Sequence, residues 1–228
     1  MPVPYLKHML FDLNPNLTVD TGEIEGVGKI VIIENFFKYP EEIKRMLDQS
    51  WVTSWKNSPI SKNFVDYYDC RFDLSKDITS FKSDGYQALI RELVDIELGI
   101  KCSNYEVPTS FNIFQWLNPP ASHHIQCMPH TDGRNILASI VYLDKYSNGG
   151  TAFYTKCREL DYTEEDDIRY DIDKHADLTE VVEANFNRCV IYPGQYPHGA
   201  HINDHNIYTG ENWRMNMVMF MEMLDKPN

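Results

Sequence analysis

Residues 213–223 read WRMNMVMFMEM, and they alternate in character with a period of two, which predicts a β-strand. One face of this strand carries a row of five methionines: Met215, Met217, Met219, Met221 and Met223. The other face carries Arg214, Asn216, Val218 and Phe220. A row of flexible apolar side chains is typical of core packing, so the methionine face should be buried.

Working outward from this strand, the chain reads as many short strands with helices confined to its N-terminal part. The expected strands cover 29–34, 110–117, 136–143, 150–154, 187–192 and 213–223, and the expected helices cover 40–49 and 84–98. Strands at this spacing indicate a mainly β protein, a closed or double-sheet barrel buttressed by helices. We find no repeat or linker, so we expect one domain over residues 1–228.

Composition narrows the class of protein. The chain has 228 residues, a net charge of −13 and 43% hydrophobic residues, which is enough to close a core. Its acidity argues against nucleic acid as a partner, and no apolar run is long enough for a membrane span or a signal peptide. The five cysteines are odd in number and form no CxxC pair, which favours a reducing, cytoplasmic setting.

The acidity is concentrated in one segment. Residues 155–185 hold 11 acidic and four basic side chains, a net charge of −7. The segment separates two apolar stretches and is interpreted as a partly helical surface insertion. It is either a solvated face, or a lid or partner-binding flap. In both cases its charge disfavours polyanions and slightly favours a cationic or zwitterionic substrate.

The triplet His130-Thr131-Asp132 is the first candidate for chemistry. Side chains two residues apart on a strand point to the same side, within reach of one ion. Imidazole and carboxylate both suit a divalent transition metal. Taken alone, the triplet is also compatible with a hydrogen-bonded surface pair.

A third ligand would complete a metal site. His198 follows an apolar strand and the turn residues of PGQYP, where a strand can end at the mouth of a barrel. His201 and His205 are close competitors. Two histidines and one carboxylate on one side of an ion, with the other positions open, are typical of non-haem Fe(II) oxygenases.

Arg214 is the only charged side chain on its face of the last strand until Glu222. A guanidinium inside an apolar sheet is costly unless it meets an anion, and its planar fork fits a carboxylate. That carboxylate belongs either to a ligand or to one of the many acidic residues of the chain.

The order of these motifs resembles that of the 2-oxoglutarate- and Fe(II)-dependent oxygenase superfamily, above all its prolyl-hydroxylase-like branch. The motifs are HTD at 130–132, YL at 142–143, GGTAFY at 149–154, PH at 197–198 and the arginine at 214. The stretch KIVIIENFFKYPEEIKRMLDQS, 29–50, is similar to the opening strand and helix of that branch. The resemblance covers roughly residues 29–223.

The resemblance implies a double-stranded β-helix, or jelly roll, with the methionine row outward under the N-terminal helices. It implies that His130, Asp132 and His198 bind Fe(II). Arg214 would pair with the distal carboxylate of 2-oxoglutarate, and Asn216 and Tyr142 would complete the cosubstrate site. The cofactors implied are Fe(II), the cosubstrate 2-oxoglutarate and O₂, with ascorbate as a supporting reductant.

The expected function is a dioxygenase that hydroxylates an unactivated C–H of a small-molecule, amino-acid or peptidyl substrate and releases succinate and CO₂. In such a family, Asp132 favours hydroxylation over halogenation, and desaturation or ring closure stays open. The alternatives are a jelly roll that binds a metal or ligand without turnover, and a cupin-type metal enzyme without 2-oxoglutarate. Arg214 argues against the cupin-type enzyme.

Overall fold

The computed structural model describes residues 10–48, 67–73, 84–103, 109–116, 118–119, 129–157 and 176–224. Its larger sheet has seven antiparallel strands in the order β1-β2-β8-β5-β10-β4-β3. These strands are β1 Thr18–Ile24, β2 Gly28–Glu34, β3 Tyr67–Asp73, β4 Thr109–Trp116, β5 Ile136–Tyr142, β8 Cys189–Pro193 and β10 Arg214–Glu222. The smaller sheet has the order β7-β6-β9 and consists of β6 Gly150–Cys157, β7 Ala176–Glu183 and β9 His198–His201. The helical elements are α2 Pro40–Asp48, α4 Asp84–Leu98 and the 3₁₀ turn η3 His205–Ile207.

The chain winds back and forth between the two sheets. β4, β5, β8 and β10 belong to the larger sheet, while β6, β7 and β9 lie in the smaller one. A single isolated bridge pairs His130 with His198 of β9, at the edge of the smaller sheet. After β4, the chain therefore visits the sheets in the order of a double-stranded β-helix, and the predicted mainly β jelly-roll class is confirmed.

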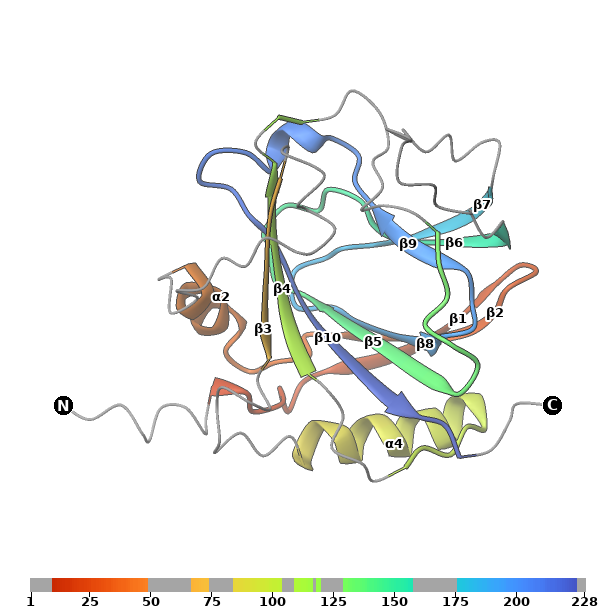
Figure 1. The fold of residues 1–228 in the computed structure, drawn as a ribbon. Coiled ribbons are helices and arrows are strands. Elements are labelled where there is room, and N and C mark those ends of the chain that lie inside the picture. The colour runs from red at the N-terminus through yellow and green to blue at the C-terminus, as the bar shows by residue number, and fades with distance from the viewer. Residues whose placement is uncertain are drawn as a thin grey trace.

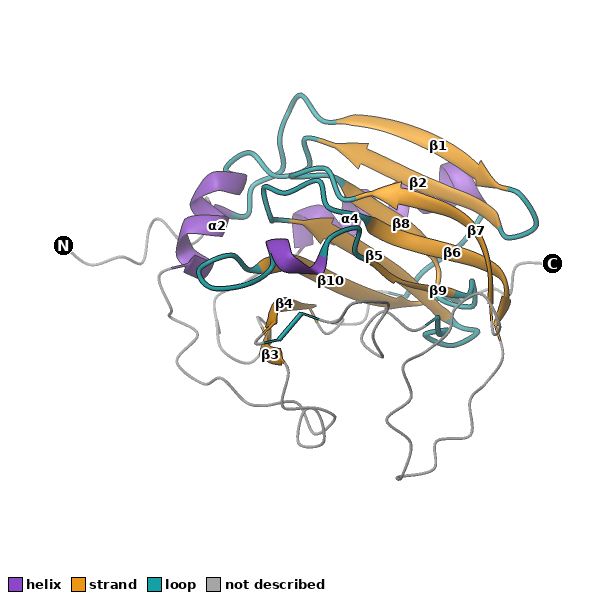
Figure 2. Cartoon of the chain, turned by 90° about the horizontal axis from the view of Figure 1, so that it is seen from above, coloured by secondary structure: helices purple, strands orange, loops and turns teal. Residues whose placement is uncertain are grey.

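The methionine row of β10 faces the helices, as expected. All five methionines belong to the main core cluster, which also contains Ile43 and Leu47 of α2 and Ile90 and Val94 of α4. In Figure 1, α4 lies below the larger sheet and the β6-β7-β9 sheet lies above it, and Figure 2 shows the same layers from above. The opposite face of β10 therefore points between the two sheets, which is where the candidate site lies.

Four strands were not expected from the sequence: β1, β3, β7 and β9. β1, TVDTGEI, is an edge strand with mostly exposed side chains, so it lacks the apolar pattern of a half-buried strand. The described ends of the acidic segment at 155–185 are strands. Its first residues end β6, and Ala176–Glu183 form β7, in which Ala176 and Val182 are buried while Asp177 and Glu180 are exposed. Residues 158–175 lie outside the described part of the chain.

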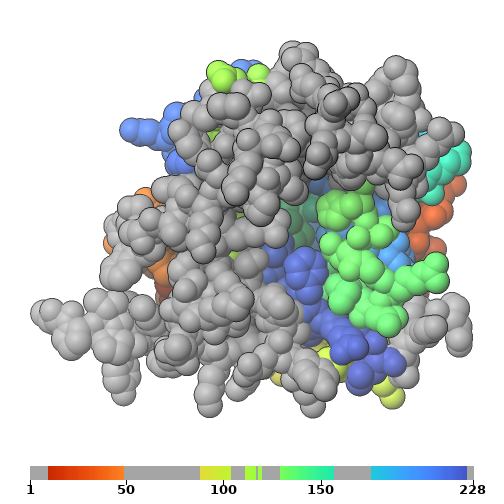
Figure 3. Space-filling model, viewed as in Figure 1, coloured from red at the N-terminus to blue at the C-terminus, as the bar shows by residue number. Residues whose placement is uncertain are grey.

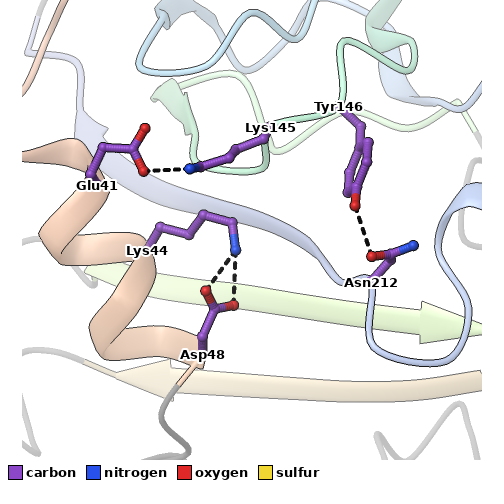
Figure 4. Close-up of polar contacts among 6 residues, drawn as sticks. All are labelled: Glu41, Lys44, Asp48, Lys145, Tyr146 and Asn212. Carbon is purple, nitrogen blue, oxygen red and sulfur yellow. Dashed lines mark hydrogen bonds and ion pairs between the residues drawn. The ribbon is translucent and has the colours of Figure 1, made fainter.

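The segments that precede Arg214 are tied together by polar contacts (Figure 4). The Lys145 ammonium pairs with Glu41 of α2 at 2.7 Å, and the Tyr146 hydroxyl donates to Asn212 Oδ1 at 2.7 Å. The loop after β5 is thereby joined to α2 on one side and to the turn before β10 on the other. The turn that leads into β10 at Arg214 is thus held in place by these contacts.

No helix among the described residues is long and apolar enough to cross a membrane. Cys102 and Cys189 are free thiols, and burial raises the pKa of Cys189 well above its ordinary value.

Candidate metal centre

His130 and His198 lie directly opposite each other. The backbone N–H of His130 donates to the His198 carbonyl at 2.8 Å, and the reverse bond is 2.9 Å long. Residues paired in this way project their side chains to the same face, and the two imidazole rings have centroids 4.5 Å apart. The pairing across the smaller sheet is what brings together two histidines that are 68 positions apart in the sequence.

Asp132 reaches the same point by a different route from the one expected. Only His130 of the triplet forms a strand bridge, and the Asp132 N–H instead donates to the Gly194 carbonyl at 2.8 Å. Its carboxylate lies 3.3 Å from His198 Nε2 and 3.7 Å from His130 Nε2. The two side chains therefore lie close together, and the contact with the turn at Gly194, not strand geometry, places the carboxylate.

The three residues form a cluster whose ligand atoms all lie within 4.8 Å of one another. Two ligands that are each about 2 Å from one ion are at most about 4 Å apart, so a small rotation brings the set to bonding distance. The His130 side chain is 55% exposed and has room to rotate, whereas that of His198 is 6% exposed. Two imidazoles and one carboxylate therefore converge from one side and leave the other side open to the cavity.

The tautomer of His198 suits a metal ligand. Its Nδ1 lies 2.8 Å from the carbonyl oxygen of Tyr196, which can only accept a hydrogen bond. Nδ1 therefore carries the proton, and the lone pair of Nε2 faces Asp132. The ring also packs against Tyr192 at a centroid distance of 4.7 Å. His198 is thus held in the orientation that a metal requires.

A cavity of about 320 Å³ opens beside this cluster, between the two sheets. It is lined by His130, Asp132 and His198, by the inward row of β10, and by Asn112, Phe114, Ser139, Thr151 and Tyr192, among others. In the space-filling view, green atoms from the segment that begins at residue 129 lie next to blue atoms of the C-terminal part of the chain (Figure 3).

Arg214 and two amides form the polar wall of this cavity. Asn216 of β10 pairs directly with Asn112 of β4, and Arg214 is two residues away on the same face. The side-chain oxygens of Asn112 and Asn216 are buried and accept no hydrogen bond. Within the part of the chain that the structure describes, Arg214 forms no ion pair with a carboxylate. The guanidinium fits an anionic group of a ligand, and the two amide oxygens fit hydrogen-bond donors.

Asp144 is an acidic side chain that interacts electrostatically with Arg214. Burial raises its pKa from 3.8 to about 6, and the positive charge of Arg214 opposes that rise. The carboxylate accepts hydrogen bonds from the Tyr146 N–H at 3.0 Å and from the Tyr208 hydroxyl at 3.3 Å. Asp144 is therefore held by its own neighbours and leaves the guanidinium available to a ligand.

The other residues expected at the site are placed less directly. The Tyr142 hydroxyl lies 2.6 Å from Thr151 Oγ1, and burial raises the pKa of Tyr142 to about 12. Thr151 lines the cavity and Tyr142 stands behind it. The competing histidines are elsewhere: the metal-ligand cluster contains His198 and not His201, and His205 packs against Trp116.

Sequence reasoning did not assign a role to Thr151, Tyr192 or Ser139. Each lines the cavity from a strand, where an inward position could be recognised only by a period of two in the sequence. That signal cannot be read from β5 and β8, because nearly every residue in both strands is buried.

The fold and this cluster together define a double-stranded β-helix protein with a candidate two-histidine, one-carboxylate metal centre. Comparison with family profiles matches residues 15–180 to the "Family of unknown function (DUF6445)". The chain belongs to this family. No curated protein matches the chain by sequence.

Several solved structures are similar to the chain. The non-heme alpha ketoglutarate dependent epimerase SnoN from nogalamycin biosynthesis has 11% identity and a TM-score of 0.48, over 85% of this chain and 78% of that one. A prolyl-4-hydroxylase of Pseudomonas putida has 12% identity and a TM-score of 0.46, over 85% and 91%. An oxidoreductase of the 2OG-Fe(II) oxygenase family from Burkholderia pseudomallei has 11% identity and a TM-score of 0.47, over 85% and 84%.

Proposed function

We propose that this protein is an Fe(II)- and 2-oxoglutarate-dependent oxygenase that hydroxylates an unactivated C–H bond. The observation that carries the proposal is the convergence of His130, Asp132 and His198 in a cavity that Arg214 also lines. A metal cluster alone would suit many functions. A metal cluster that shares its cavity with a guanidinium lacking a carboxylate partner among the described residues suits a ligand that bridges the two.

The donor set fits Fe(II). Imidazole nitrogen and carboxylate oxygen suit a divalent iron that keeps open positions, and the chain supplies three ligands from one side. When bound, the iron and 2-oxoglutarate would supply the oxidising power, with release of succinate and CO₂. The contribution of the chain is to hold these groups and to exclude water from the space between the sheets.

Different residues of the cavity would hold the metal and the cosubstrate. His130, Asp132 and His198 would hold the iron, and Arg214 would hold the distal carboxylate of 2-oxoglutarate through its fork of N–H donors. Asn216, beside Arg214, would donate from its amide to the same carboxylate. Tyr142 would act through Thr151, whose hydroxyl it contacts. Burial of these groups strengthens each of the electrostatic contacts.

The substrate we propose is a small molecule, amino acid or peptidyl group of neutral or positive charge. β7, in the same sheet as His198, exposes Asp177, Glu180 and Glu183, and the acidity continues in the sequence before it. Carboxylates on this sheet would repel polyanions. Asp132 keeps a carboxylate in the metal set, which favours hydroxylation over halogenation in this class of site.

The decisive experiment combines metal binding with turnover. The purified chain is incubated with Fe(II), ascorbate, 2-oxoglutarate and O₂, and succinate is measured. The His198→Ala variant should lose metal binding and succinate formation. The His201→Ala variant, changed on the same strand, should keep both. The absence of succinate together with the absence of Fe(II) binding by the wild-type chain would refute the proposal, whereas binding of Fe(II) without succinate would favour a metal-binding protein without turnover.

A further inference from the structure

The turn between β8 and β9, residues 193–197, touches two of the three proposed metal ligands. The Gly194 carbonyl accepts the Asp132 N–H at 2.8 Å, and the Tyr196 carbonyl accepts from His198 Nδ1 at 2.8 Å. The turn is closed by a bond from the Tyr196 N–H to the Pro193 carbonyl at 3.0 Å. The position of this one turn therefore sets both the Asp132 backbone and the His198 ring.

Close approach fixes the Asp132 side of the turn. A Cβ at Gly194 would lie 3.0 Å from the Cβ of Asp132 and 3.0 Å from the Ile136 carbonyl oxygen, which is tighter than most real contacts. The Gly194 N–H also donates to the Ile136 carbonyl at 2.6 Å. The turn is thus pressed against the Asp132 segment without a side chain between them.

The Tyr196 side chain leaves the site and lies against the β1–β2 hairpin. A Cβ at Gly28 would lie 2.2 Å from the Tyr196 hydroxyl oxygen and 2.7 Å from the ring carbon that bears it. Gly28 also has a φ of 138°, a conformation that side chains rarely adopt. The phenol is half-buried and lies beside the backbone of Lys29, the residue that follows Gly28. The hairpin thus leaves space at Gly28 that the hydroxyl end of the Tyr196 ring fills.

We propose that the β1–β2 hairpin is a positioning element of the metal centre, acting through Tyr196. The absence of a side chain at Gly28 lets the Tyr196 ring pack against the hairpin, and this packing fixes the backbone of Tyr196. The Tyr196 carbonyl then orients His198 so that Nε2 faces the ion. This inference rests on the proposed metal site. It assigns a role to a hairpin that contributes no ligand and lies about 100 residues before His130 in the sequence.

Gly28→Ala tests the contact between Gly28 and the Tyr196 ring, and Gly26→Ala is its matched control. Both glycines belong to the β1–β2 turn and both have positive φ, 138° and 70°. A Cβ at Gly26 meets only Thr155, at 2.9 Å from its Cγ2.

Co(II) affinity is measured by calorimetry, the Co(II) absorption spectrum reports coordination geometry, and denaturant unfolding reports stability. Gly28→Ala should weaken Co(II) binding about 10- to 100-fold, the usual effect of losing a partner that orients a metal ligand, and should alter the spectrum. Gly26→Ala should lose comparable stability and keep both.

Tyr196→Ala is the second variant, in case Gly28→Ala folds poorly. It keeps the carbonyl but removes the ring, so it should weaken Co(II) binding to a similar extent. In the double variant the two effects should not add, because the methyl group introduced at position 28 then has no ring to displace. Equal Co(II) affinity in the wild type, Gly28→Ala and Tyr196→Ala overturns the inference. If the wild type itself binds no Co(II), or His198→Ala binds it equally well, the metal site is refuted and this inference falls with it.

Discussion

Arg214→Met is the variant that most sharply tests the cosubstrate site. Methionine replaces the guanidinium by an apolar side chain that β10 and the residue after it already accommodate at five other positions. Among the described residues Arg214 has no carboxylate partner, so the substitution breaks no ion pair there. Its effect on 2-oxoglutarate binding is therefore separable from an effect on folding.

The magnitude follows from the geometry of the fork. A bidentate contact to a carboxylate comprises two charged hydrogen bonds, each worth about 1.5–3 kcal/mol, so about 3–6 kcal/mol is lost. Each 1.4 kcal/mol corresponds to about a factor of ten, so the Kd for 2-oxoglutarate should rise by about 100-fold or more. The assay is calorimetric titration of 2-oxoglutarate into the Mn(II)-loaded protein, with Mn(II) affinity measured separately and expected to be unchanged.

Arg188→Met is the matched control. Arg188 lies just before β8 and is 16% exposed, but its Nε donates to Glu34 at 2.7 Å and its Nη1 to the Glu183 carbonyl at 2.9 Å. Arg188→Met should lower the free energy of unfolding and leave the Kd for 2-oxoglutarate within about twofold, since it breaks a structural pair. If Arg214→Met binds 2-oxoglutarate as tightly as the wild type, or if both variants lose the same affinity, the role assigned to Arg214 is wrong.

Three further substitutions test the surrounding structure. Met217→Ala, at a fully buried position, should lower the free energy of unfolding by about 2–5 kcal/mol in denaturant titrations, and a smaller loss than in an exposed control would contradict the packing described. Asp144 has its pKa raised from 3.8 to about 6, so the folded chain binds more protons than the unfolded chain between these values and its stability falls as pH rises through them. Asp144→Asn should therefore gain up to about 3 kcal/mol relative to the wild type between pH 3.5 and pH 7, and a constant difference would contradict this. Tyr142→Phe should cost about 1 kcal/mol of stability through the lost contact with Thr151, and a tenfold weaker binding of 2-oxoglutarate would show instead that Tyr142 contacts the cosubstrate directly.

The fold could be predicted wherever a strand has one buried face. The alternation of β10 located its methionine face correctly, because a period of two separates the faces of a strand directly in the sequence. β1 and β7 were missed, since their side chains are largely exposed and pair with neighbours through the backbone. Backbone pairing leaves little trace in side-chain pattern, and long-range register leaves none.

For the candidate site, the residue types were readable and their assembly was not. His130, Asp132, Arg214 and three histidines near residue 200 were candidates by their chemistry, and the resemblance to the oxygenase superfamily favoured His198 among the three. The choice of His198 over His201 depended on which residue pairs with His130 across the smaller sheet. The placing of Asp132 depended on a carbonyl 62 residues away, at Gly194. Local order in the chain specifies which groups are present, whereas distances between them come from hydrogen bonds across the sheets, which no local pattern encodes.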